Sequence, residues 1–214
     1  MSGRRTILTV APYAAWIALM LLLPATASSY AVRTAVSAWF LLALIFLERV
    51  RPVPTLAQFA IGLVAGIGVY WLWTAPEAFE WYRRWCVLGS SAATDRSPYD
   101  PAVCGWPLTL VRLFGSAVII AAAEELFFRS FLYRRLQKSD WTSVDPRRLD
   151  LSAFLWTVGL FALEHDRIVV GALAGVVYGF VYIRRGLGAA VVAHAATNLA
   201  LGLEVIRSGA WGYW

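Results

Sequence analysis

The chain of 214 residues has little charge: Asp, Glu, Lys and Arg make up only 15% of it, while hydrophobic residues make up 60%. Soluble globular domains are typically about 45–50% apolar and about 25% charged. A soluble protein of this composition could not cover its own apolar surface, whereas lipid solvates the outside of a membrane bundle. The composition therefore excludes an ordinary soluble domain and predicts a polytopic membrane protein.

The net charge of +6 and the pI near 9.7 do not indicate a nucleic-acid partner, because the basic residues gather at the ends of apolar runs. By the positive-inside rule, we assign to the cytoplasm the ends flanked by Arg4, Arg5, Arg49, Arg51, Arg134, Arg135, Lys138, Arg147, Arg148, Arg184 and Arg185. Fewer fall in the opposite loops, namely Arg33, Arg83, Arg84, Arg96, Arg167 and Arg207. We therefore expect a bacterial inner-membrane protein with a cytoplasmic N-terminus.

Long apolar runs dominate the chain, and a membrane helix needs about 20 mostly apolar residues. We expect an all-α transmembrane bundle of about seven helices, six to eight, around a buried polar cavity. The predicted spans are 7–27, 31–47, 56–74, 106–128, 150–165, 167–183 and 187–206. The fifth and sixth are short and nearly continuous, so a re-entrant turn at 164–167 would change the count.

Cysteine is also scarce. Cys86 and Cys104 both fall in the outer loop 75–105, where the sequence is compatible with a disulfide or with two free thiols. Small residues recur at helical spacing instead, which favours close helix packing; they are Gly62 and Gly66, and Gly171, Gly175 and Gly179. Tryptophan and tyrosine gather near helix ends as an aromatic belt, to which we assign the closing Gly-Tyr-Trp.

Two adjacent carboxylates, Glu124 and Glu125, interrupt an apolar helical run, and Arg129 follows. An ionised side chain in the bilayer core costs at least about 2.5–3.5 kcal/mol, so each needs a partner. A spacing of four places Arg129 on the face of Glu125, where it neutralises that carboxylate. Glu124 then points about 100° away around the helix and is free to face a cavity. This pattern predicts a general base; the alternative is a salt bridge near the cytoplasmic interface.

The chain has only two histidines, His165 and His194, and both lie in apolar helical sequence. Asn198 follows His194 by four residues, so the imidazole and the amide share one helix face. Such a pair can donate two hydrogen bonds to a developing oxyanion, or it can join packed helices. Polar groups in a membrane pair with one another, so we expect the glutamates and histidines of three helices to converge on one site.

Glutamate and histidine together can activate water for amide hydrolysis. No serine or cysteine with an adjacent base is evident, because Ser116, Ser130 and Ser152 have no histidine near them in sequence. A zinc set of Glu124, His165 and His194 is an alternative, but the His-Glu-x-x-His spacing is absent. We therefore expect a site without a cofactor. A proton-relay transporter is a further alternative, but the sequence shows no inverted repeat.

Three ordered motifs on three predicted helices resemble the CPBP family of CAAX proteases and bacteriocin-processing enzymes. The resemblance covers about residues 106–206 and implies an intramembrane endopeptidase that cuts near the C-terminus of a membrane-associated protein or peptide. It divides the single membrane domain into N-terminal helices with the outer loop, 1–105, and a catalytic core, 106–214. The motifs are Glu124-Glu125-x-x-x-Arg129, Phe161-x-x-x-His165 and His194-x-x-x-Asn198.

The same resemblance implies roles for these residues. Glu124 and His165 would activate the water, and His194 with Asn198 would form the oxyanion site. The supporting residues would be Glu125 and Arg129.

A finer resemblance rests on Glu164-His165-Asp166-Arg167, on AHAATNLALG and on the closing SGAWGYW. These segments look like the bacterial CAAX-protease-related branch found with exosortase sorting systems. That branch would imply a C-terminal membrane anchor peptide as substrate rather than a prenylated protein. Glu164 and Arg167 can equally cap a short turn. A non-catalytic immunity or scaffold protein of the same fold is the remaining alternative.

Overall fold

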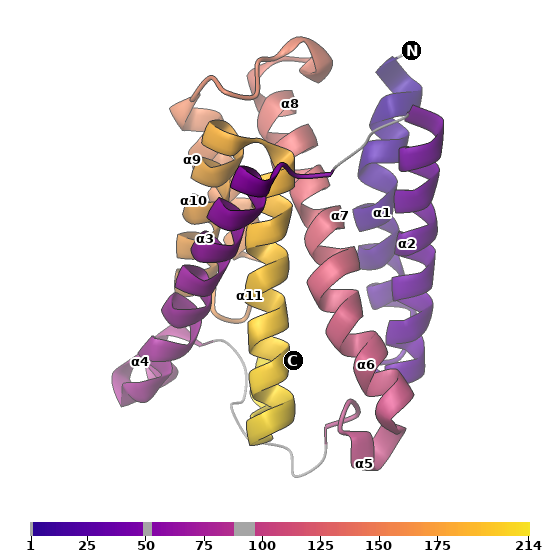
Figure 1. Cartoon of the computed structure of the whole chain (residues 1–214), viewed down its shortest axis with the longest axis vertical. Helices are drawn as coiled ribbons and strands as arrows, with labels where there is room; N and C mark the ends of the chain where they lie inside the picture. The colour runs from indigo at the N-terminus through magenta and orange to yellow at the C-terminus, as the bar shows by residue number, and fades with distance from the viewer. Residues whose placement is uncertain (1, 49–52, 88–96) are drawn as a thin grey trace.

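The computed structural model describes residues 2–48, 53–87 and 97–214, and these parts are helical without any strand, as the sequence predicts. Arg49, Arg51 and Arg96 lie outside the described residues. Figure 1 shows long helices side by side in one bundle, with the N-terminus at its upper end and the C-terminal end of the chain lower down.

Six helices are long and apolar enough to cross a membrane, so the chain is an integral membrane protein. They run as α1 (Ser2–Leu22), α2 (Ala27–Glu48), α3 (Leu56–Thr74), the continuous run α6 to α8 (Trp106–Gln137), α10 (Ile168–Arg185) and α11 (Leu187–Ser208).

The remaining predicted span is α9 (Leu151–Ala162), which has only 12 residues. At 1.5 Å per residue it is about 18 Å long, short of the ~30 Å hydrocarbon core. The chain turns back at residues 163–167 into α10. Six long helices and one short one lie within the predicted range of six to eight, and the turn is at the place where the sequence allowed one.

Short elements connect the long helices at the two ends of the bundle. We call the end that carries Ser2 and the α10–α11 connection the N-terminal face, and the end that carries α4 and α5 the C-terminal face (Figure 1). Cys86 and Cys104 are free thiols at the C-terminal face. The short elements are η1 (Ala75–Ala78), α4 (Glu80–Cys86), α5 (Pro101–Cys104), η4 (Trp141–Ser143) and η5 (Trp211–Tyr213).

The longest helix is not uniform. Gly105, with φ +80°, starts it, and Pro107 lies in its first turn, where proline is tolerated. Two π-helical stretches lie on either side of the glutamate pair, and such widened turns are frequent at functional sites. The order along the run is α6 (Trp106–Phe114), η2 (Gly115–Ile120), α7 (Ala121–Glu125), η3 (Leu126–Leu132) and α8 (Tyr133–Gln137).

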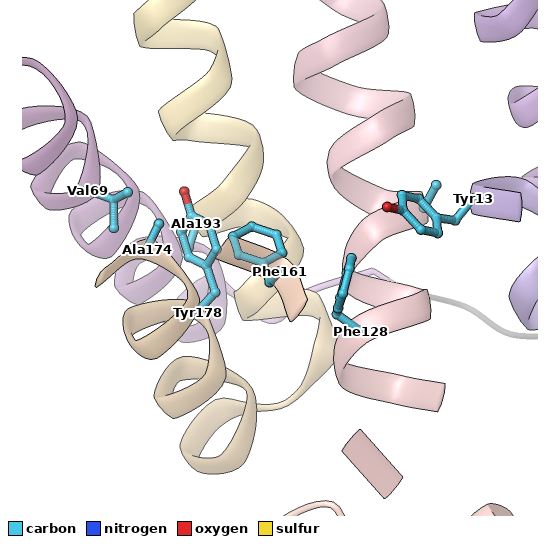
Figure 2. Packing of buried hydrophobic residues seen from close by; sticks show 8 residues of the cluster. Tyr13, Val69, Phe128, Phe161, Ala174, Tyr178 and Ala193 are labelled. Carbon is cyan, nitrogen blue, oxygen red and sulfur yellow. The ribbon is translucent and has the colours of Figure 1, made fainter. Parts of the chain in front are cut away.

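A row of aromatic rings fills the core beside these glutamates. Phe161 of α9 lies 5.3 Å from Phe128 and 6.2 Å from Tyr178, measured between ring centroids, and Tyr13 of α1 lies 5.5 Å from Phe128. Figure 2 shows Phe161 between Tyr178 and Phe128. The row thus ties α1, η3, α9 and α10 together.

The glycines allow close helix contacts, as predicted. A Cβ atom on Gly62 of α3 would lie 2.6 Å from the backbone oxygen of Ala189 on α11, and one on Gly66 would overlap the backbone oxygen of Ala193. On α10, a Cβ atom on Gly179 would lie 2.6 Å from the ring of Phe154. Larger residues at Gly62 and Gly66 would push α3 away from α11, which carries His194 and Asn198.

Candidate active site

A cavity of about 350 Å³ lies inside the bundle and is lined by Glu124, His165, His194 and Asn198. These four residues come from α7, from the turn after α9 and from α11, so the predicted convergence of three segments is found. Its lining also includes residues near the C-terminal face, namely Met20, Arg33, Tyr99, Arg112, Tyr213 and Trp214. The cavity therefore extends from the buried carboxylate of Glu124 toward that face.

Glu125 and Arg129 form the predicted ion pair, with 3.3 Å between Arg129 Nε and Glu125 Oε2. Both side chains are buried, at 0% and 2% exposure. The guanidinium carbon of Arg129 also lies 4.2 Å from the ring centroid of Phe161, and its Nη2 donates to the backbone oxygen of Gly175 at 3.4 Å. The pairing keeps Glu125 charged inside the bundle.

His194 lies between the two glutamates. Its Nδ1 is 3.1 Å from Glu125 Oε1, and its Nε2 is 3.6 Å from Glu124 Oε2. Because Glu125 is held as a carboxylate, which only accepts hydrogen bonds, Nδ1 donates to it and Nε2 faces Glu124. The ring of Tyr178 stacks on the imidazole at a centroid distance of 4.8 Å and fixes its plane.

These contacts of His194 were not predicted from the sequence. Glu125 and His194 are 69 positions apart, and no local pattern joins them. Tyr178 was also missed, because a tyrosine on an apolar helix carries no signal of its own. Its hydroxyl donates to Thr197 Oγ1 at 2.7 Å, which locks the ring against α11.

His165 lies across the same cavity. Its Nδ1 is 2.9 Å from the backbone oxygen of Phe161, which can only accept, so Nδ1 carries the proton and Nε2 is left as an acceptor. The rings of Phe161 and Trp73 hold the imidazole, at centroid distances of 4.8 and 5.3 Å. His165 thus shares a cavity with Glu124, while the histidine within ion-pair distance of Glu124 is His194.

Asn198 lies one turn after His194 on α11. Its Nδ2 donates to the backbone oxygen of Ser116 in η2 at 3.0 Å. One N–H of the amide is thus used to fix the side chain, and the second is left for a ligand. Ser116 lines the cavity as well, but its hydroxyl donates to the backbone oxygen of Leu113 at 3.0 Å.

The acidic turn beside His165 is arranged differently from the predicted cap. Arg167 pairs with Glu77 of η1, whose carboxylate accepts from Arg167 Nε. Glu164 lines the cavity instead. The arginine therefore anchors the α9–α10 turn to the end of α3.

The three residues of the alternative zinc set, Glu124, His165 and His194, line one cavity. Among the described residues, no group of three or more His, Cys, Asp and Glu side chains is arranged to hold a metal ion.

The bundle of membrane helices encloses glutamate, histidine and asparagine side chains around one cavity, and these are groups that an intramembrane hydrolase can use. A family model described as type II CAAX prenyl endopeptidase, Rce1-like, matches residues 106–200, which include all six of the predicted polar residues. Over this segment, which is less than half of the chain, the sequence is similar to the Rce1-like family of type II CAAX prenyl endopeptidases. No curated protein and no solved structure matches the chain.

Proposed function

We propose that the chain is an intramembrane endopeptidase that hydrolyses a peptide bond near the C-terminus of a membrane-associated protein or peptide. The observation that carries this proposal is the carboxylate of Glu124, which is 13% exposed at the inner end of the cavity and 3.6 Å from His194 Nε2. Its Oε2 atom has no hydrogen-bond partner among the described residues. A carboxylate kept in a membrane protein at such a cost is a functional group by default.

Glu124 is the proposed general base. A water in the cavity gives a proton to the Glu124 carboxylate while its oxygen attacks the carbonyl carbon of the scissile bond. His165 Nε2, an acceptor on the opposite wall, orients the second water hydrogen. When the C–N bond breaks, the proton on Glu124 passes to the leaving amine, so that no other co-reactant is needed.

His194 and Asn198 are the proposed oxyanion site. An imidazolium at His194 donates from Nε2, and the carboxylate of Glu125 next to Nδ1 stabilises that charge. The free N–H of Asn198 supplies a second donor one turn away. Such fixed donors stabilise the charge that develops on the substrate oxygen without reorganising.

For the substrate we propose a C-terminal membrane anchor peptide, since the cavity lies inside the bundle and an anchor peptide reaches it from the bilayer. A prenylated protein C-terminus, as the family description suggests, is the competing substrate. The two are distinguished by offering the same peptide with and without a prenyl group.

We also propose that the N-terminal face lies in the cytoplasm of a bacterial cell. This face carries the start of α1, which includes Arg4 and Arg5, and α8, which includes Arg134 and Arg135 (Figure 1). An impermeant maleimide added to intact spheroplasts tests this in a cysteine-free background. It should label Arg84→Cys at the C-terminal face and not Asp145→Cys at the N-terminal face. The reverse pattern would invert the topology.

The decisive experiment is cleavage of anchor peptides by purified protein in detergent, read by mass spectrometry. Glu124→Gln should lower the rate by about 10²–10⁴-fold, the usual contribution of a general base. Glu204→Gln, which changes a half-buried carboxylate on α11 that pairs with Arg207 outside the cavity lining, is the matched control and should cleave at the wild-type rate.

Other outcomes point to the alternatives. Full activity of Glu124→Gln would overturn the mechanism. Loss of wild-type activity in a chelator, restored by Zn²⁺, would establish the metal-dependent alternative. If no peptide is cleaved while a cellular function survives Glu124→Gln, the chain is the non-catalytic scaffold.

A further inference from the structure

Two arginines line the outer part of the cavity, and no acidic residue that the structure describes forms an ion pair with either of them. Arg33 of α2, which the sequence placed in a loop, is 7% exposed, and Arg112 of α6 is half-buried. Both line the cavity that Glu124 closes at its inner end. Among the described residues, neither arginine forms a salt bridge, and the Nε atoms of both are buried without a hydrogen-bond partner.

The side chains of Arg33 and Arg112 lie against aromatic rings. The guanidinium carbons of Arg33 and Arg112 lie 5.3 and 4.4 Å from the centroid of the same ring, that of Tyr30. The two positive charges therefore lie beside one ring. Three further rings contact one or the other arginine, namely Trp16, Tyr99 and Trp214.

Such an arrangement is incomplete without an anion. A buried charge is normally paired with an opposite charge, and a ring face compensates for only part of its desolvation. Guanidinium groups have a planar set of donors that fits a carboxylate or a phosphate. The pair is inside the cavity wall rather than on the lipid-facing surface, which favours a ligand that enters the cavity over a lipid headgroup.

We propose that Arg33 and Arg112 form a subsite that binds the C-terminal carboxylate of the peptide. This inference rests on the proposed endopeptidase function and deepens it. The subsite holds the end of the chain while Glu124 and His194 act on a bond further in. Trp214 and Tyr99 form the walls around the carboxylate, so the closing Gly-Tyr-Trp has a place in the cavity besides the predicted aromatic belt.

The subsite also sets where the peptide is cut. Arg112 precedes Ser116, whose carbonyl holds Asn198, by about one helical turn, and it precedes Glu124 by 12 residues on one continuous helix. These separations are roughly 6 and 18 Å along the axis. At about 3.3–3.6 Å per extended residue, the scissile bond lies about two to five residues from the bound carboxylate.

The test uses a library of anchor peptides with six randomised C-terminal residues, made once with a free carboxylate and once as carboxamides. Wild type should cleave the acids with a kcat/KM about 10- to 100-fold above that of the amides, as expected for charge-assisted hydrogen bonds. Arg33→Gln, Arg112→Gln and the double variant should lose this preference. Arg207→Gln, an exposed arginine at the same face, is the matched control and should keep it.

The acid-to-amide ratio separates recognition from a structural role, because a misfolded variant loses both rates together. The position of the cut is a second readout. When a peptide with a free C-terminal carboxylate is lengthened by two residues at that end, the cleaved bond should shift by two residues toward the C-terminus. An unchanged cut, or equal cleavage of acids and amides by wild type, would overturn the proposal.

Two further experiments are needed. The first tests whether the anion is a peptide carboxylate or a lipid phosphate, and the second tests the carboxylate subsite without relying on catalysis. In phosphatidylcholine vesicles with and without phosphatidylglycerol, activity that follows the anionic lipid, together with an acid-to-amide ratio of one, would assign the site to a lipid phosphate. Binding of the fluorescein-labelled acid and amide libraries to Glu124→Gln, measured by anisotropy, needs no catalysis. If that variant prefers acids while wild type cleaves nothing, the proposed function fails and the carboxylate subsite stands.

Discussion

The two ends of the cavity treat buried charge in opposite ways. At the inner end, Glu125 has both Arg129 and His194 as partners, at 3.3 and 3.1 Å. At the outer end, Arg33 and Arg112 lie against aromatic rings and have no carboxylate among the described residues.

The charged groups at the inner end are paired within the protein, whereas those at the outer end are available to pair with a ligand. The inner charges neutralise one another, so His194 keeps a fixed position with or without substrate, as preorganised catalysis requires. The outer charges attract an anion, and the field along the cavity runs from positive at the mouth to negative at Glu124. A peptide with a C-terminal carboxylate fits that direction.

The largest difference between the two ends is expected when one arginine is removed from each and the free energy of unfolding is measured. Arg129→Met leaves the buried carboxylate of Glu125 without its cation and should lower the free energy of unfolding by about 3–5 kcal/mol. Arg33→Met removes a charge that pairs with no carboxylate in the part of the chain that the structure describes. The change should therefore stay within about 1 kcal/mol, because the loss of a cation–π contact is offset by the loss of a desolvation penalty. Unfolding in mixed detergent micelles measures both.

The double variant Glu125→Gln with Arg129→Met is the control for this pair. It removes the carboxylate along with its partner and should recover most of the stability that Arg129→Met loses. Equal losses for Arg129→Met and Arg33→Met would show that the two ends are not different in kind.

The inner end was largely predictable from the sequence. The spacing of four residues predicted the ion pair between Glu125 and Arg129. Because Glu124 is the adjacent residue on the helix, it was predicted to point elsewhere, toward a cavity, and it lines one. Both follow from helix geometry within one segment. The link from Glu125 to His194 was not predictable, since it depends on how α7 and α11 pack.

The outer end was not predictable, because its parts are far apart in the chain. Arg33 was assigned to a loop, although α2 begins at Ala27 and buries it. In the sequence, Arg112 is a single basic residue in an apolar run, and nothing near it in the chain indicates a partner. The rings around them come from α1, α2, the segment before α5 and the last residues of the chain, and only the tertiary structure brings these together.

A smaller effect is expected from Asn198→Ala. This variant tests whether the inner end of the cavity stabilises an oxyanion. The rate constant kcat should fall by about 10²–10³-fold with little change in KM, the usual loss for one oxyanion donor. If Asn198 only joined α11 to η2 through Ser116, the variant would lose about 1 kcal/mol of stability and keep its kcat. Steady-state kinetics and detergent unfolding on the same preparation distinguish these results.

The smallest effect is expected from Ser116→Ala, at the boundary between the two ends. The Ser116 hydroxyl donates to the backbone oxygen of Leu113, and only its carbonyl is used by Asn198, which alanine retains. Activity should therefore stay within about two-fold of wild type, as for a substitution worth ~0.5 kcal/mol or less. Cleavage kinetics on one acid peptide measure this. A loss of several orders of magnitude, with an acyl-enzyme visible by mass spectrometry, would make Ser116 the nucleophile and leave Glu124 as its base rather than the base for water.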